Sequence, residues 1–245
     1  MATPKLVVGG TSVTASQLSE MFRQFGTGEL NGEHTQALIE HRDPFKIDMS
    51  RGGQLMSWCR LFKDLFGLEI DPTTVSIPEP KDGFGRLIVV PQGLMLNQIL
   101  GVCRKRFDNV YSVYNNLDQQ VTVNDRTSVQ TYAIWIRNRV EADEEFSNFS
   151  ADQLKEKDVL GVTLMERLLL ELKYHSETGE HLDIENITLC SGSRDSDGNV
   201  PDVNWNRDNR KLYVNSHNPR NRNANLRARQ EVSRNKESIV GSFCV

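Results

Sequence analysis

The chain has 245 residues, of which 38% are hydrophobic and 25% charged, and its formal net charge is -4. This length accommodates a substantial core, in one large domain or in one domain with a smaller companion. The charge is neither basic enough for a general nucleic-acid binder nor acidic enough for a disordered tail. No apolar run reaches the roughly 18 residues of a membrane-spanning helix, and the first residues lack a secretory signal pattern. We therefore expect a cytoplasmic protein, with the virion or surface display as other destinations.

The first 80 residues predict a small helical region. Apolar residues at helical spacing indicate three short helices, over about 14–25, 33–41 and 50–66. The first opens with Thr14 and Gln17, which have the spacing of a capping box, and the second ends before Pro44. The segment 71–85 then carries three prolines and two glycines. We place the boundary between region 1–80 and domain 81–245 in that segment.

The elements of the second region alternate between strands and helices. We expect a strand over 86–90, a helix from Pro91 to about Phe107, two strands joined by a turn over 109–125, and a strand over 131–137. Ser150 opens a short helix. Thr163 and Glu166 open a longer one that ends at Gly179, before a strand over 184–189. This order predicts an α+β fold.

Few residues have the spacing of a metal site. The four cysteines lie far apart and form no C-x-x-C pair, which argues against a zinc module and leaves a disulfide open: Cys59, Cys103, Cys190 and Cys244. His34 and His41 are seven residues apart but have no third partner nearby. The best carboxylate cluster comprises Glu141, Asp143, Glu144 and Glu145. Acidic residues are also favoured at a helix start, and we prefer that structural role. We expect no metal and no cofactor.

The last quarter, Cys190–Arg229, is unusually rich in asparagine. Nine asparagines lie between Asn199 and Asn225, interleaved with four arginines. Asparagine competes for the local backbone and is expected in turns and loops. Apolar residues punctuate the block, among them Val203, Trp205 and Leu212. Two interpretations are open: a solvated loop region with a few anchors, or a rigid scaffold that presents many interchangeable polar side chains.

The layout W-N-x-D-x-R-x-L-x-V, followed by N-P-x-N-R-N-x-N-L-R-x-R, carries a family resemblance. It resembles the variable region of C-type-lectin-fold proteins that are diversified by retroelements. The resemblance is strongest over 190–233 and extends back to about Leu87. It implies a C-type-lectin-like (formylglycine-generating-enzyme-like) domain over 81–245 with a variable segment at 192–229. In that family diversification targets adenines, so asparagine codons become varied residues.

The resemblance also implies a division of roles within the segment. Trp205, Leu226, Arg227 and Arg229 would be framework residues. A recognition surface would be formed by twelve polar or aromatic residues: Asn204, Asn206, Arg207, Asn209, Tyr213, Asn215, His217, Asn218, Arg220, Asn221, Arg222 and Asn223. We expect a non-catalytic protein whose unknown ligand is a protein, with tyrosine and arginine as the main contact residues.

Calcium binding is not expected at the terminal block. The run Asp195-Ser-Asp197-Gly198-Asn199 alternates oxygen ligands as an EF-hand loop does. That loop needs glycine at its sixth position and glutamate at its twelfth, where this chain has Val200 and Asn206. The calcium and sugar triplets of the sugar-binding lectins are also missing.

Catalysis is not expected either. Cys190 and Cys244 lack the close spacing of the copper-binding pair in formylglycine-generating enzymes. Ser191 or Ser193 with His217 could supply a nucleophile and a base, but no G-x-S-x-G elbow is present.

Nucleic-acid binding is the alternative function. From Val203 to Arg229, six arginines and one lysine face Asp208 alone, a local charge of about +6. Trp205 and Tyr213 could stack on bases. The competing interpretation is that Arg227 and Arg229 tie the end of the domain to acidic side chains such as Glu141 or Glu144.

Overall fold

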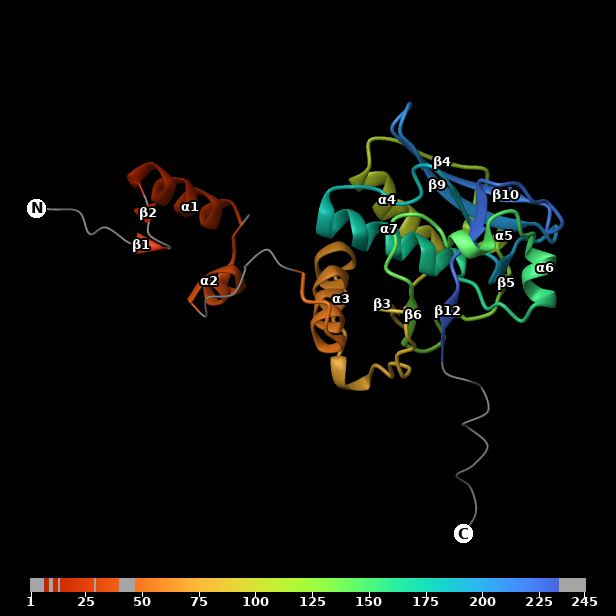
Figure 1. Ribbon diagram of the computed structural model, residues 1–245, viewed down its shortest axis with the longest axis horizontal. Helices are drawn as coiled ribbons and strands as arrows, with labels where there is room; N and C mark the ends of the chain where they lie inside the picture. Colours follow the sequence, from red (N-terminus) through yellow and green to blue (C-terminus); the bar gives the residue numbers. More distant parts are fainter. Residues whose placement is uncertain (1–6, 9–10, 13, 29, 40–46, 234–245) are drawn as a thin grey trace, which may run out of the picture. The chain divides into compact units, whose positions relative to one another are not determined.

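The computed structural model describes residues 7–8, 11–12, 14–28, 30–39 and 47–233 (Figure 1). The chain divides into two compact units, Met1–Asp48 and Met49–Val245. Predicted features at His41, Pro44 and Cys244 lie outside the described residues.

The first unit contains a short hairpin and two helices. Strand β1 (Val7–Val8) pairs antiparallel with β2 (Thr11–Ser12). Helix α1 (Ala15–Thr27) begins with the predicted capping box, since the Thr14 side chain accepts the Gln17 N–H and the Gln17 side chain accepts the Thr14 N–H. It ends at Gly28, whose φ of 79° is in the left-handed region that favours glycine. Helix α2 spans Gly32–Ile39.

The second unit begins earlier than the predicted boundary within 71–85. Helix α3 (Arg51–Phe66) packs against strand β3 (Arg86–Val90). Trp58 Nε1 donates to the Leu87 carbonyl at 2.9 Å, and Gln54 Oε1 accepts the Leu87 N–H at 2.8 Å. The proline-rich segment is also packed, because Trp135 Nε1 donates to the Pro78 carbonyl. Proline removes backbone donors but leaves carbonyls and apolar surface for tertiary contacts.

A three-stranded sheet has the order β12-β6-β3. Strands β3 and β6 (Tyr132–Ile136) confirm their predicted ranges and pair antiparallel, with Arg86 opposite Ile136. Strand β12 (Glu231–Val232) pairs antiparallel with the other edge of β6. The end of the described chain therefore pairs with a strand that precedes it by 95 residues in the sequence, since Glu231 lies opposite Ile136.

A five-stranded sheet has the order β11-β7-β9-β10-β4. The central strand β9 (Val200–Asn206) and its neighbour β10 (Lys211–His217) form an antiparallel hairpin. Strand β7 (Ile187–Leu189) pairs antiparallel with β9, while β4 (Val110–Ser112) runs parallel to β10 and β11 (Leu226–Ala228) parallel to β7.

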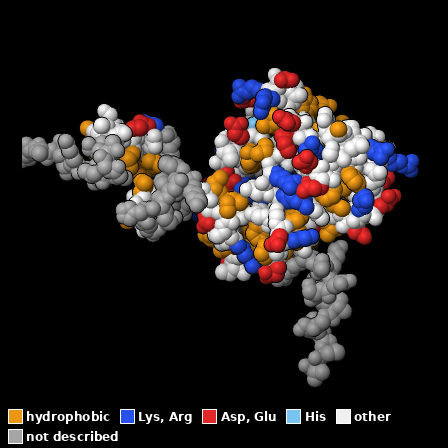
Figure 2. All heavy atoms as spheres, viewed as in Figure 1, with side chains coloured by type: hydrophobic (Ala, Val, Ile, Leu, Met, Phe, Trp, Pro, Cys, Tyr) orange, Lys and Arg blue, Asp and Glu red, His pale blue; other side chains and the backbone are white. Residues whose placement is uncertain are grey.

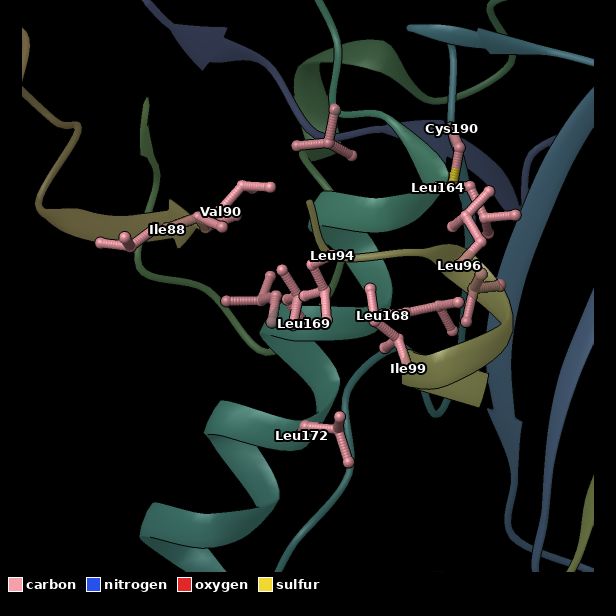
Figure 3. Packing of buried hydrophobic residues seen from close by; sticks show 14 of the residues in the cluster. Ile88, Val90, Leu94, Leu96, Ile99, Leu164, Leu168, Leu169, Leu172 and Cys190 are labelled. Atoms are coloured by element: carbon pink, nitrogen blue, oxygen red, sulfur yellow. The ribbon is translucent and has the colours of Figure 1, made fainter. Parts of the chain in front are cut away.

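Helix α7 (Leu164–Thr178) packs against both sheets, through β3 and β9, and against α4 (Leu96–Arg106). Its predicted capping box is confirmed at Thr163 and Glu166, and Gly179 ends it. Figure 3 shows Leu168 and Leu169 of α7 pointing into the same cluster as Ile99 of α4 and Ile88 of β3, and all four are buried. One face of the β9–β10 hairpin packs into this core.

One predicted supersecondary unit differs in the structure. The segment 109–125 was expected to form two strands joined by a turn, but helix α5 (Leu117–Gln120) lies between β4 and β5 (Val123–Asn124). Strand β5 pairs with β8 (Ser193–Arg194) in a separate two-stranded sheet. The α+β class is confirmed. Helix α6 (Ala151–Glu156) begins at the predicted Ser150 capping box, and short 3-10 helices occur at Pro72–Thr74 and Glu144–Phe146.

Buried charges fix the end of the domain. Arg229 is 1% exposed and pairs with Asp183 at 2.6 Å, and its guanidinium also donates to the carbonyls of Arg139 and Val140. Arg229 therefore pairs with Asp183 and not with Glu141 or Glu144, the partners expected from the sequence. Asp183 also pairs with Arg167 at 2.9 Å. Removing one partner would leave an uncompensated charge, which is strongly destabilising.

Candidate functional site

The Asn-rich block contains the two longest strands among the described residues, although Asn was expected to mark loops. In the hairpin, Asn204 lies opposite Tyr213 and Trp205 opposite Leu212. Alternate strand residues point to opposite faces. One face, with Val203, Trp205, Leu212 and Val214, is buried against the core. The period-two placement of these apolar residues was the sequence signal for strands.

None of the twelve residues predicted to form the recognition surface is buried. Asn204, Asn206, Tyr213, Asn215 and His217 lie on the outer face of the hairpin, opposite its buried face. The other seven lie in the two loops that follow β9 and β10: Arg207, Asn209, Asn218, Arg220, Asn221, Arg222 and Asn223.

The recognition surface is elongated. The loop 207–210 joins β9 to β10 at one end of the hairpin, and the loop 218–225 follows β10 at the other end. Strand β10 spans Lys211–His217, a length of about 20 Å at the usual rise per residue. The structure thus places five of the twelve residues on one face of the hairpin and the other seven in loops at its two ends.

Tyr213 lies at the centre of a cluster of polar and aromatic groups. Asn209 Nδ2 donates to Tyr213 Oη at 2.8 Å, and Lys211 Nζ lies 5.7 Å from the Tyr213 ring centroid. The ring of Tyr111, from β4, is 5.6 Å away. Tyr111 is 45% exposed and Val113 47% exposed. Sequence reasoning missed these two as surface residues because they lie nearly 80 positions before Cys190, where the Asn-rich block begins, although their alternation was visible.

Several asparagines of the surface also stabilise their own turns. Asn206 Oδ1 accepts the Asn209 N–H at 3.1 Å, and Asn223 Oδ1 accepts the Leu226 N–H at 2.8 Å. Asn218 Oδ1 accepts the Arg220 N–H at 3.1 Å. Such side-chain to backbone bonds are typical of Asn in turns. These three positions therefore combine exposure with a local structural role.

His217 is tied to a buried carboxylate rather than free in solvent. Its Nδ1 lies 2.7 Å from Oδ2 of Asp202, which is 1% exposed. The hydrogen bond to Asp202 raises the pKa of His217, while burial raises the pKa of Asp202. Oδ1 of Asp202 has no hydrogen-bond partner among the described residues. A change at His217 should thus affect stability as well as recognition.

The arginines of the block do not share one face. Arg207 and Arg210 are exposed at the loop between β9 and β10, where Arg210 pairs with Asp108 at 2.7 Å. Arg220 and Arg222 are exposed at the opposite end of the hairpin. Arg229 is buried. On the face shown in Figure 2, basic and acidic side chains are intermixed.

No hydrogen bond joins His217 to either of the serines considered for catalysis, all three of which are described residues. Ser193 Oγ donates to Asn124 Oδ1 and accepts the Leu164 N–H, and Ser191 Oγ is buried without a hydrogen-bond partner in the described chain. His217 contacts Asp202 rather than either serine. Within the part of the chain that the structure describes, Cys59, Cys103 and Cys190 are free thiols.

Two of the carboxylates considered for metal binding, Asp195 and Glu141, accept backbone hydrogen bonds. Asp195 Oδ1 accepts the N–H groups of Asp197 and Asn199, which makes the run at 195–199 a turn. Glu141 accepts backbone N–H groups from the segment 184–186. Among the described residues, no three His, Cys, Asp or Glu side chains are grouped closely enough to hold a metal ion.

Comparison of the chain with protein-family models, curated protein sequences and solved structures finds no match. No helix within the described ranges has the length and apolar character needed to cross a bilayer.

Proposed function

We propose that the unit Met49–Val245 is a non-catalytic, C-type-lectin-like ligand-binding domain, the variable protein of a diversity-generating retroelement. The observation that carries the proposal is the alternation in the β9–β10 hairpin. Residues that the family resemblance assigns to the scaffold, such as Trp205 and Leu226, are buried, whereas none of the twelve recognition residues is. Exchange of the outer residues can change the ligand while the inner residues keep the fold.

A protein is the class of ligand that suits the recognition surface best. Amide side chains both donate and accept, so asparagines adapt to many partners, and tyrosines supply large contact area at low entropic cost. The pair Tyr111 and Tyr213 lies beside Asn204 and Asn209, which places an aromatic contact among amides. Aromatic and arginine residues are the usual hot spots of protein interfaces.

The first test is genetic. The DNA flanking the gene should contain a reverse transcriptase gene and a near-copy of the stretch encoding about 192–229, differing mainly at adenines. The mismatched codons should fall at the twelve recognition positions. A flanking sequence with neither feature would remove the retroelement from the proposal.

The second test measures whether the recognition surface tolerates exchange of its residues. A displayed library randomised at the outer positions should fold in most of its members and should yield binders to an arbitrary protein target. A matched library randomised at Val203, Trp205, Leu212 and Val214 should fold rarely. Equal folding rates in the two libraries would contradict the division between surface and scaffold.

Nucleic-acid binding is the second candidate, favoured by the four exposed arginines of the block. Its weakness is that they are divided between the two ends of the hairpin. Binding of a single-stranded oligonucleotide, followed by fluorescence anisotropy, separates the two functions. Phosphate-driven binding should weaken steeply as salt rises, whereas recognition through amides and aromatic rings should change little.

A further inference from the structure

A cavity of about 410 Å³ lies where the C-terminal ends of α4 and α7 meet the loop between β9 and β10. Its lining includes Phe107, His175, His181, Trp205, Arg106 and Arg207. This volume is within the range of sites that hold small molecules. Most of these residues lie outside the Asn-rich block, so the cavity is largely independent of the recognition surface.

Four aromatic rings form one side of the cavity. The rings of His181 and Trp205 are stacked, with centroids 3.4 Å apart and planes at 7°. His175 lies 4.8 Å from His181, and Phe107 packs edge-on at 5.0 Å from each histidine. Rings packed this closely give a rigid surface for the apolar part of a ligand.

A buried carboxylate fixes the orientation of His181. Its Nδ1 lies 2.8 Å from Glu171 Oε1, and the other carboxylate oxygen of Glu171 accepts from Arg167 at 2.7 Å. Glu171 and Arg167 are both fully buried. A carboxylate beside Nδ1 places the ring proton there and leaves Nε2 for another partner. The ring is thus oriented by the fold before any ligand arrives.

The rim of the cavity has a surplus of positive charge. Arg210 is balanced by Asp108, with which it pairs at 2.7 Å. Arg106 makes one weak bond, to Ser176 Oγ at 3.4 Å, and Arg207 makes no side-chain ion pair within the described chain. Glu180 and the negative ends of α4 and α7 oppose an anion, but helix-end effects on exposed groups are weaker than charge-assisted hydrogen bonds to two arginines.

We propose that this cavity binds a small ligand bearing an anionic oxygen group, a phosphate or a carboxylate. Arg106 and Arg207 hold the anionic group, while the rings of His175, His181 and Phe107 contact the rest of the ligand. Because Arg207 also belongs to the recognition surface, occupation of the cavity changes one end of that surface.

Titration with inorganic phosphate, and separately with benzoate, tests the site by calorimetry and by the ring NMR signals of the histidines. We expect a dissociation constant on the order of 1 mM for the better probe, with shifts of the His175 and His181 signals and not of His217. Arg207→Gln should weaken binding about tenfold, which corresponds to about 1.4 kcal/mol. The matched control Arg220→Gln, an exposed arginine at the far end of the hairpin, should leave it unchanged.

Arg106→Gln provides a second variant on a different element and should weaken binding as Arg207→Gln does. Equal losses in Arg207→Gln and Arg220→Gln would show non-specific attraction to the basic segment and would overturn the proposal. So would the absence of binding by both probes, or binding that leaves the His175 and His181 signals in place. Thermal unfolding of each variant confirms that its fold is retained.

Discussion

The two faces of the β9–β10 hairpin share one backbone but have opposite roles. On the inner face, Trp205 and Leu212 are paired across the strands and buried in the same core cluster as residues of α4 and α7. On the outer face, the adjacent pair Asn204 and Tyr213 is partly exposed. A shift of one residue in the register would exchange the two sets. Alternation along two seven-residue strands thus keeps the residues that stabilise the fold separate from those available for recognition.

The largest expected effect is on the inner face, where Trp205→Ala removes the ring that stacks on His181 and contacts Phe107. Truncation of a buried tryptophan costs about 3 to 5 kcal/mol of unfolding free energy. Chemical denaturation measures this loss. A loss below about 1 kcal/mol would mean that the site collapses without a cavity and that the inner face is less important than its burial indicates.

His217 lies on the outer face but should nevertheless contribute to stability, because it contacts buried Asp202. His217→Ala leaves that carboxylate unpaired and should cost about 1 to 3 kcal/mol. Because the folded-state pKa of His217 is raised, its contribution is fully present below the ordinary histidine pKa and is lost as pH rises through the folded-state value. Wild type and variant should therefore differ most in mild acid, below the ordinary pKa of histidine but above the raised pKa of Asp202, because the pair needs the ionised carboxylate. A difference that grows with pH would contradict this pairing.

A smaller effect, of opposite sign, is expected in the loop that joins the two strands. Arg210 has a φ of 49°, a left-handed conformation that is unfavourable for a residue with a Cβ. Its ion pair with Asp108 is exposed and contributes little. Arg210→Gly should thus raise the unfolding free energy by about 1 kcal/mol. Asp108→Ala is the control, and it should change stability by less than about 0.5 kcal/mol.

The smallest effect on stability is expected for the aromatic pair of the outer face. Tyr111→Ala and Tyr213→Ala should each change the unfolding free energy by at most about 1 kcal/mol, the size of a cross-strand pair. Either change should raise the dissociation constant of a ligand selected on this surface by about tenfold or more. If Tyr213→Ala instead destabilises the domain as much as Trp205→Ala does, the outer face belongs to the scaffold and the two faces do not have separate roles.

Elements that depend on neighbouring residues were predictable from the sequence. The capping boxes at Thr14, Ser150 and Thr163 each place a side chain three residues from the N–H that it accepts, and all three helices begin there. The strands at 86–90 and 131–137 also have the expected ranges to within a residue. That none of the twelve recognition residues is buried follows from the polar composition of the block.

Contacts between distant residues were decided only by the tertiary structure. Sequence order does not reveal that β4 pairs with β10 rather than with β5, that Arg229 reaches Asp183, or that Tyr111 lies beside Tyr213. These choices depend on which buried surfaces fit together once the chain has collapsed, and many pairings satisfy the same local pattern. By itself the sequence determined where the capped helices begin and that the twelve recognition residues are not buried. The packing of α7 between two sheets decided which of those exposed side chains share a face, because only the folded core fixes the direction of each strand.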